Sequence, residues 1–207
     1  MIKIQGELPP RFVLACSGGV DSMSVLDFVR RKHQVTVLYI NHQTVQANMM
    51  QGCIKEYCVN NDIQDLVVEK IETAQCPAGK SPEEHWRDER YKIIDRVAES
   101  RGVPAITAHH LDDCVETWIW SSMHGNPKVV PYRRNRVIRP FRLTPKKQFR
   151  QWAKTHDVTH IEDASNTEMR YTRNYVRHVC VPHAKHINPG IEKTISKKIL
   201  NEEVQYE

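Results

Sequence analysis

The sequence lacks several features that define whole classes of protein. No stretch of its 207 residues comes near the roughly 20 consecutive apolar residues that a membrane helix needs. Residues 1–6 do not show the basic-then-apolar run of a signal peptide, so we expect a cytoplasmic protein. The six cysteines form no C-x-x-C pair, which argues against a zinc or iron–sulfur site and favours free thiols.

Acidic residues are missing from one strongly basic segment. Residues 128–150 contain nine Lys and Arg residues and no Asp or Glu, although the whole chain has a net charge of only +5. A run of one sign indicates either a solvated basic face or a surface for a polyanion. We favour the polyanion, because Tyr132 and Phe141 lie inside the run and aromatic rings can stack on unpaired bases. The nine basic residues are Lys128, Arg133, Arg134, Arg136, Arg139, Arg142, Lys146, Lys147 and Arg150.

Apolar runs alternate with helical patterns in the first part of the chain. Strands that alternate with helices predict a parallel sheet with right-handed crossovers. The fold class is therefore α/β, with a five-stranded parallel sheet flanked by helices. Ser81 is the expected N-cap of the third helix. We expect strands at residues 12–16, 35–40, 66–71 and 104–108, and helices from residue 23, at 44–61, at 82–100 and at 112–123.

The pattern changes after residue 123. Residues 124–143 are rich in Pro and Arg and leave room only for short strands. A helix is expected from residue 145 to about residue 156, and a short one at 191–200. We expect residues 1–127 to form the core of the domain. Residues 128–207 would complete the same domain with the basic segment and a short helical extension.

A glycine-rich loop joins the first expected strand to the first helix, and its sequence is Ser17-Gly18-Gly19-Val20-Asp21-Ser22. Glycines let the backbone approach an anion closely, and a helix start supplies unpaired N–H groups and positive partial charge. Asp21 would repel a phosphate, so we interpret it as a ligand for the Mg²⁺ that accompanies ATP. The alternative is a glycine-rich turn with an Asp cap. The loop has neither the G-K-[ST] of a Walker A loop nor the G-x-G-x-x-G of a dinucleotide loop.

This loop resembles the SGGxDS loop of the N-type ATP pyrophosphatases, the PP-loop superfamily. Members of that superfamily cleave ATP between the α and β phosphates and transfer AMP to a carbonyl oxygen. The resemblance implies a Rossmann-type PP-loop fold with ATP and Mg²⁺ as cofactors. Residues 17–22 would hold phosphate, and Asn41 and His42, which follow the second expected strand, would lie near the adenosine.

Three further segments resemble one family of that superfamily, the tRNA(Ile)-lysidine synthetases. Residues 81–91 are similar to its E-x-x-A-R-x-x-R-Y helix, with both Arg and the Tyr matching and Trp86 in place of Ala. Residues 107–117 are similar to the T-A-H-H-x-D-D-x-x-E-T segment. Residues 161–177 resemble E-D-x-S-N followed by R-N-x-[IV]-R. The matches follow the family's order over most of the chain.

The resemblance implies a role for the acids and the histidine of the second segment. Asp21 and Asp113 would hold Mg²⁺, with Asp112 and Glu116 assisting. His109 would stabilise the negative charge on the transferring phosphoryl group. We therefore expect Asp21, His109 and Asp113 to be the catalytic residues, and Asp21, Asp113 and Glu116 to be the metal ligands.

The resemblance also implies the reaction and its partners. ATP would adenylate the C2 oxygen of the wobble cytidine in an isoleucine tRNA with a CAU anticodon, and free lysine would then displace AMP. Arg87 would reach a phosphate or ribose of the nucleotide, and Asp163 and Asn166 would cap the helix that carries two further arginines. The C-terminal RNA-binding domains of the family are not expected here. The expected RNA contacts are Arg133, Arg134, Arg136, Arg139, Arg173 and Arg177.

Two other functions stay open. One is a different RNA modification, such as thiolation of a cytidine, although the absence of C-x-x-C argues against its iron–sulfur type. The other is a non-catalytic nucleic-acid-binding remnant, against which the intact Asp21, His109 and Asp113 argue. An oligomer is compatible with the sequence, and no membrane partner is expected.

Overall fold

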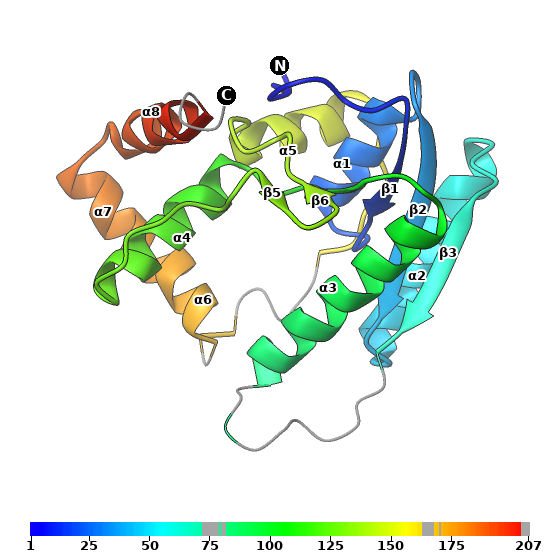
Figure 1. Ribbon diagram of the computed structural model, residues 1–207, viewed down its shortest axis with the longest axis horizontal. Helices are drawn as coiled ribbons and strands as arrows, with labels where there is room; N and C mark the ends of the chain where they lie inside the picture. Colours follow the sequence, from blue (N-terminus) through cyan, green and yellow to red (C-terminus); the bar gives the residue numbers. More distant parts are fainter. Residues whose placement is uncertain (72–78, 80–81, 163–167, 170, 204–207) are drawn as a thin grey trace.

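The computed structural model describes residues 1–71, 79, 82–162, 168–169 and 171–203, and it is an α/β fold (Figure 1). The elements expected up to residue 156 are present, while Ser81, the expected N-cap of a helix, lies outside the described residues. The strands are β1 (Arg11–Ala15), β2 (Gln34–Asn41), β3 (Leu66–Lys70), β4 (Ala105–Thr107), β5 (Arg133–Arg134) and β6 (Val137–Ile138). The helices are α1 (Val20–Val29), α2 (Val45–Asn60), α3 (Pro82–Ser100), α4 (Leu111–Met123), α5 (Lys146–Thr155), α6 (Thr172–Tyr175), the π-helix η2 (Val176–Cys180), α7 (Val181–Ile187) and α8 (Ile191–Glu203).

The strands form one sheet in the order β3-β2-β1-β4-β6-β5. The α/β class is confirmed, but the described residues hold six strands rather than five, and β5 runs antiparallel to β6. Both side chains of this two-residue strand are exposed, so it leaves no apolar pattern in the sequence. β1 pairs in parallel with β2 and with β4. The carboxyl ends of β1 and β4 therefore meet where the strand order reverses, which is where α/β sheets place their ligands.

Helices cover both faces of the sheet because side chains alternate along β1. Leu14 belongs to a buried core with Met23 of α1, Ile54 of α2 and Phe149 of α5. The preceding residue, Val13, points to the opposite face and belongs to a second core with residues of α3. This division places α1, α2 and α5 on one face and α3 on the other (Figure 1).

The C-terminal helical segments pack on α4. Ile119 of α4 shares a third apolar core with Val176 of η2 and Ile195 of α8. The sequence predicted one short helix here, and α8 is that helix, but residues 172–187 are also helical, as α6, η2 and α7. Among the described residues, no helix is long and apolar enough to cross a membrane.

A buried acid ties three helices of one face together. Asp27 of α1 is 2% exposed. It accepts hydrogen bonds from Arg30 (2.9 Å), from the hydroxyl of Tyr57 in α2 (2.7 Å) and from the indole of Trp152 in α5 (2.9 Å). Burial opposes the ionisation of Asp27, but these bonds outweigh burial and hold its pKa below the ordinary value.

We expect Asp27→Ala to lower the free energy of unfolding by about 3 kcal/mol, because the donors on Arg30, Tyr57 and Trp152 lose their shared buried acceptor. A depressed folded pKa means that this stabilisation is complete above the unfolded pKa of about 4 and is lost as the pH falls through the folded value. Urea unfolding between pH 7 and pH 3 should therefore show a constant gap between wild type and variant that narrows only below about pH 4.

The matched control is Glu56→Ala, which removes an exposed acid of α2. It should lower the free energy of unfolding by less than about 0.5 kcal/mol at every pH. If the gap for Asp27→Ala stays constant down to pH 3, the carboxylate is not the group that carries the stabilisation.

Candidate active site

The loop between β1 and α1 requires glycine at one position. Gly18 has a φ of +84°, and a Cβ there would lie 3.1 Å from the Cβ of Met50. Gly19 has an ordinary φ of −79°, is the N-cap of α1 and provides no side-chain cap. The first turn of α1 therefore keeps the unpaired N–H groups that bind anions. Val20 contributes its backbone to this turn, since its side chain is buried.

Two serines fold the loop around this helix start. The Ser22 hydroxyl accepts a hydrogen bond from the N–H of Ser17 (3.1 Å) and donates one to the carbonyl of Gly19 (3.1 Å). Ser22 is buried, whereas Ser17 is exposed. Ser22 thus shapes the loop from inside, and Ser17 presents its hydroxyl to solvent. The contact of this loop with phosphate stays a prediction.

His110 bridges two of the expected acids. Its Nε2 lies 3.4 Å from Oδ2 of Asp21, and its Nδ1 lies 3.5 Å from Oδ2 of Asp113. His110 is the N-cap of α4, and its backbone N–H donates to the Asp113 carboxylate (2.9 Å). Burial disfavours charge at all three residues, but their mutual attraction outweighs it, so the pKa of His110 is raised and the pKa values of Asp21 and Asp113 are lowered.

A lysine from α5 completes this charged cluster. Nζ of Lys146 lies 3.1 Å from Oδ2 of Asp21. The backbone N–H of Lys146 donates to the carboxylate of Asp112 (2.8 Å), which joins the starts of α4 and α5. The sequence placed Lys146 only among nine basic residues and suggested no role for His110. No spacing in the sequence shows that α5 begins beside α1, so this part of the site was not predicted.

One oxygen of Asp21 has no partner among the described residues. Its Oδ1 is buried and makes no hydrogen bond with them, whereas Oδ2 faces His110 and Lys146. Mg²⁺ bound with a nucleotide is held by one or two carboxylates together with phosphate oxygens. A buried free carboxylate oxygen beside an anion-binding helix start fits such a cation, and Asp113, on the far side of His110, is the second acid within the cluster.

Glu116 is paired with an arginine of η2. Its carboxylate is bonded by Arg177 of η2 at 2.7 and 3.0 Å. Within the described ranges, no group of three or more His, Cys, Asp and Glu side chains is arranged to hold a metal ion. Arg177 thus occupies both carboxylate oxygens of Glu116, and the role of Glu116 as a metal ligand stays a prediction. Arg177 is held by this pair, and Arg173 is partly exposed, 3.7 Å from Asp113. The contacts of both arginines with RNA stay predictions.

The residues at the end of β2 are held by the protein itself. Asn41 is 2% exposed and donates hydrogen bonds to Asn48 (3.0 Å) and Gln51 (2.7 Å) of α2. His42 is half-buried, with its ring 6.4 Å from that of Trp86 in α3. Both residues lie at the same edge of the sheet as the glycine loop, because β2 is the parallel neighbour of β1. Their contact with adenosine stays a prediction.

His109 is neutral in this environment. Its Nδ1 lies 2.7 Å from the hydroxyl of Thr107, at the end of β4. Burial, together with the charges of Arg139 and Arg173, lowers the pKa of His109 to about 3 despite the nearby Asp113. A neutral imidazole keeps one N–H, so His109 can stabilise developing negative charge only as a hydrogen-bond donor. Its catalytic role stays a prediction.

The basic segment 128–150 does not form one surface. Arg139 and Arg142 are each 1% exposed, and Phe141 is fully buried. Arg139 donates hydrogen bonds to the carbonyl of Pro131 and to the hydroxyl of Tyr91. Both side chains are buried because the chain turns into the core directly after β6, so Phe141 has no exposed face on which a base could stack. The contact of Arg139 with RNA stays a prediction. The exposed arginines of the segment's hairpin are Arg133, Arg134 and Arg136.

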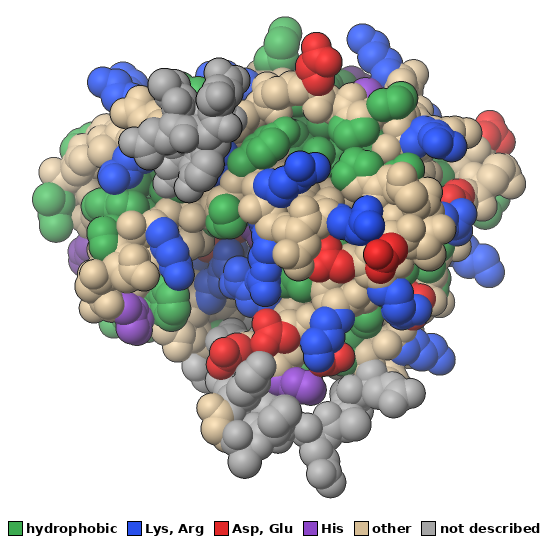
Figure 2. All heavy atoms as spheres, in the orientation of Figure 1, with side chains coloured by type: hydrophobic (Ala, Val, Ile, Leu, Met, Phe, Trp, Pro, Cys, Tyr) green, Lys and Arg blue, Asp and Glu red, His purple; other side chains and the backbone are tan. Residues whose placement is uncertain are grey.

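Arginines from α3, β5 and α6 gather near one another. Figure 2 shows Lys and Arg side chains in a hollow between the surface over α3 and that over α4 and α6. The guanidinium of Arg87 lies 5.8 Å from the centroid of the Tyr91 ring, and that of Arg134 lies 4.5 Å from it. No hydrogen bond within the described part of the chain joins Arg87 to the glycine loop, so its contact with the nucleotide stays a prediction.

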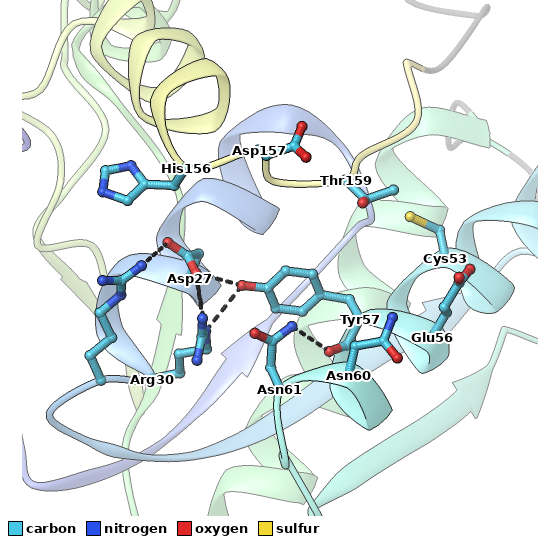
Figure 3. A pocket seen from close by; sticks show the side chains of 11 residues that line it. Asp27, Arg30, Cys53, Glu56, Tyr57, Asn60, Asn61, His156, Asp157 and Thr159 are labelled. Atoms are coloured by element: carbon cyan, nitrogen blue, oxygen red, sulfur yellow. Dashed lines mark hydrogen bonds and ion pairs between the residues drawn. The ribbon is translucent and has the colours of Figure 1, made fainter.

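A separate pocket of about 270 Å³ lies toward the other end of α1 (Figure 3). Asp27, Arg30 and Tyr57 line it together with His156 at the end of α5. In Figure 3 the Tyr57 hydroxyl and Arg30 both point at Asp27, so these polar groups satisfy one another. Asp27 lies about 9 Å along α1 from Asp21. The pocket is therefore distinct from the cluster around the glycine loop.

The fold and the site together define a class of protein. A glycine loop that leads into a helix start follows the first strand at the point where the strand order reverses, and acids at the start of α4 face it across His110. The family model of the PP-loop domain matches residues 3–184. The chain belongs to the PP-loop family.

Curated relatives of this chain are tRNA(Ile)-lysidine synthases. The chain is 30% identical over 199 residues to the one from Lactiplantibacillus plantarum, which covers 89% of this chain and 44% of the relative. It is 31% identical over 187 residues to that of Haemophilus ducreyi, with 84% and 42% covered. For Francisella philomiragia the identity is 29% over 227 residues, with 98% and 56% covered. The chain spans about half the length of the curated relatives it matches.

Solved structures share the fold at low sequence identity. A U34-tRNA thiolase from Methanococcus maripaludis matches with a TM-score of 0.76 and 14% identity, over 94% of this chain and 73% of that chain. An NH3-dependent NAD synthetase from Campylobacter jejuni matches with a TM-score of 0.53 and 12% identity, over 98% and 89%. At such identities the likeness concerns the fold alone.

We expect Gly18→Ala to lower the free energy of unfolding by about 1–2 kcal/mol, because the positive φ is strained for alanine. Gly19→Ala is the matched control: its φ is ordinary, and its Cβ would meet the Ser17 hydroxyl at a comfortable 3.6 Å. Its effect should be smaller, below about 1 kcal/mol, since it loses only the preference of an N-cap position for Gly over Ala. Urea unfolding measures both variants, and equal losses would show that the loop does not hold this conformation.

Proposed function

We propose that this chain binds ATP at residues 17–22 and transfers AMP to a carbonyl oxygen, with release of pyrophosphate. The observation that carries the proposal is the buried, unpartnered Oδ1 of Asp21 at the start of α1. An acid at an anion-binding helix start is favourable when a cation accompanies the phosphate. Membership of the PP-loop family supports the same function.

The glycine loop and α5 bind the phosphates in this proposal. The N–H groups at the start of α1 and the exposed hydroxyl of Ser17 donate hydrogen bonds to phosphate oxygens. Lys146 places a positive charge beside the loop, 3.1 Å from Asp21. The chain thus surrounds the triphosphate with donors and cations from two helix starts.

In this proposal the charged cluster around His110 stabilises the departing pyrophosphate. Asp21 and Asp113 would hold Mg²⁺, which neutralises charge on the departing pyrophosphate when it is bound. His110 keeps both carboxylates ionised and fixes their orientation from between them. The neutral His109 donates an N–H toward the transferred phosphoryl group.

We propose an isoleucine tRNA with a CAU anticodon as the acceptor and free lysine as the final substrate. The names of the curated relatives support this choice, as do the exposed arginines of the β5–β6 hairpin. The C2 oxygen of the wobble cytidine attacks the α-phosphorus of ATP, and pyrophosphate leaves. The ε-amine of lysine then attacks C2, the C2–O bond breaks, and AMP leaves with loss of a proton from the nitrogen.

Asp21→Ala should reduce formation of AMP and pyrophosphate by at least about 100-fold while the protein stays folded. The matched control is Asp65→Ala, which removes a partly exposed acid that pairs with Arg101 before β3. Pyrophosphate release with ATP and tRNA is the measurement, and circular dichroism checks the fold. Release at the wild-type rate from Asp21→Ala would remove the basis of the ATP proposal.

Replacing Arg133, Arg134 and Arg136 with Ala should weaken tRNA binding whatever the RNA sequence. It should also flatten the slope of log K against log salt by roughly 0.7–0.9 per lost phosphate contact. The control removes the same charge from the exposed face of α8, through Lys193, Lys197 and Lys198. If both triple variants change the slope equally, the hairpin is only one part of a diffuse basic surface.

Labelled lysine should enter an isoleucine tRNA with a CAU anticodon when the protein, ATP and Mg²⁺ are present. A tRNA with uridine at the wobble position is the control and should gain no label, because it offers no cytidine. Adenylation of the tRNA without lysine incorporation would restrict the proposal to the activation step. Transfer of sulfur to the same base would replace lysine ligation with thiolation.

A further inference from the structure

Three guanidinium groups surround one buried tyrosine. Arg134, Arg139 and Arg87 lie 4.5, 5.6 and 5.8 Å from the centroid of the Tyr91 ring. Tyr91 is 8% exposed, and its hydroxyl accepts a hydrogen bond of 3.0 Å from Arg139. The arginines come from α3, from β5 and from the chain after β6, so three segments converge on one ring. We call these four residues the Tyr91 arginine cluster.

The three arginines of the cluster form no ion pair with a carboxylate of the described residues, whereas the neighbouring Arg136 pairs with Glu99. Asp88 and Asp95 line the same pocket as Tyr91 and Arg134. Arg139 is 1% exposed, and its Nε has no hydrogen-bond partner. Charged groups that leave water are normally paired. A crowd of cations around a buried, partly unsatisfied guanidinium is therefore an arrangement that an anion would stabilise.

We propose that the Tyr91 arginine cluster is a binding site for a phosphodiester of the RNA strand, in which Tyr91 is a positioning residue for Arg87 and Arg134. The face of an aromatic ring attracts a guanidinium plane and restricts its motion. A planar guanidinium held in this way can bind a phosphate through two parallel hydrogen bonds. The proposal rests on the RNA substrate proposed above and names the groups that would hold its backbone.

The surroundings of the cluster favour RNA over a free nucleotide. Arg133 and Arg136 are exposed on the same hairpin as Arg134, and Arg90 is exposed one helical turn after Arg87. An RNA strand carries one phosphate per nucleotide, so several arginines spread over α3 and the β5–β6 hairpin could each contact a different phosphate. A nucleotide phosphate has its own site at the glycine loop, to which no described hydrogen bond joins the cluster.

The first test is the affinity for an unmodified tRNA transcript with a CAU anticodon, measured by filter binding. Tyr91→Leu removes no charge but removes the ring, so affinity should fall about 10-fold. Tyr91→Phe keeps the ring and should stay within about 3-fold of wild type. The matched control is Tyr57→Leu, since Arg30 lies 5.9 Å from that ring in a network already satisfied by Asp27. It should leave RNA affinity unchanged.

A second variant keeps the test independent of the core. Arg134→Lys retains the charge on the surface but loses the planar stack, and it should also weaken RNA binding. The double variant Tyr91→Leu with Arg134→Lys should lose less binding free energy for RNA than the sum of the two single losses, because both changes remove the same stacking of Arg134 on Tyr91. If Tyr91 has only a structural role, the losses of RNA binding free energy from the two single changes should add in the double variant.

The outcomes separate this proposal from the proposed function. If the wild type binds no tRNA, the RNA substrate itself fails. If tRNA binds and neither folded Tyr91→Leu nor Arg134→Lys alters the affinity, the cluster is not a phosphodiester site. If these variants weaken ATP binding and spare RNA binding, the cluster serves the nucleotide and the proposal is overturned.

Discussion

The convergence of three helix starts is the constraint on which the rest of the site depends. α1, α4 and α5 all begin beside the carboxyl end of β1, and each brings a positive dipole end to the same small region. The positive ends of these helices are balanced by three acids, Asp21, Asp112 and Asp113. His110 contacts Asp21 and Asp113, and Lys146 contacts Asp21 and Asp112, so the acids are linked to one another. Oδ1 of Asp21 has no hydrogen-bond partner among the described residues, and the proposed cation site rests on this atom.

α1 carries two polar networks of opposite character. Asp27 accepts hydrogen bonds from donors on α1, α2 and α5, among them Arg30, Tyr57 and Trp152, and such a satisfied network rigidifies the packing of these helices. Around Asp21, two turns earlier, one buried oxygen has no partner in the part of the chain that the structure describes. Unsatisfied buried groups are rare in folded proteins and call for a ligand or an ion as explanation. A satisfied buried acid and an unsatisfied one thus lie within one helix.

Local chemistry made the glycine loop, the strands around it and the fold class predictable. Gly18 and Gly19 follow an apolar run and precede an acid, and each of these signals acts on its neighbours in the chain. Side-chain direction in irregular segments was not predictable. Glu116 meets Arg177, and Arg139 turns inward to Tyr91, through contacts between residues far apart in the sequence. The strand β5 escaped prediction because two exposed arginines carry no apolar signal.

The π-helix η2 joins α6 directly to α7. A π-turn holds one residue more than an α-turn, and η2 carries Arg177, which binds Glu116, and Val176, which packs in the core with α4. The wider turn therefore lets two adjacent side chains reach α4, Arg177 at Glu116 and Val176 in the apolar core, before the chain resumes α-helical geometry in α7. One extra residue of chain is thus absorbed within η2.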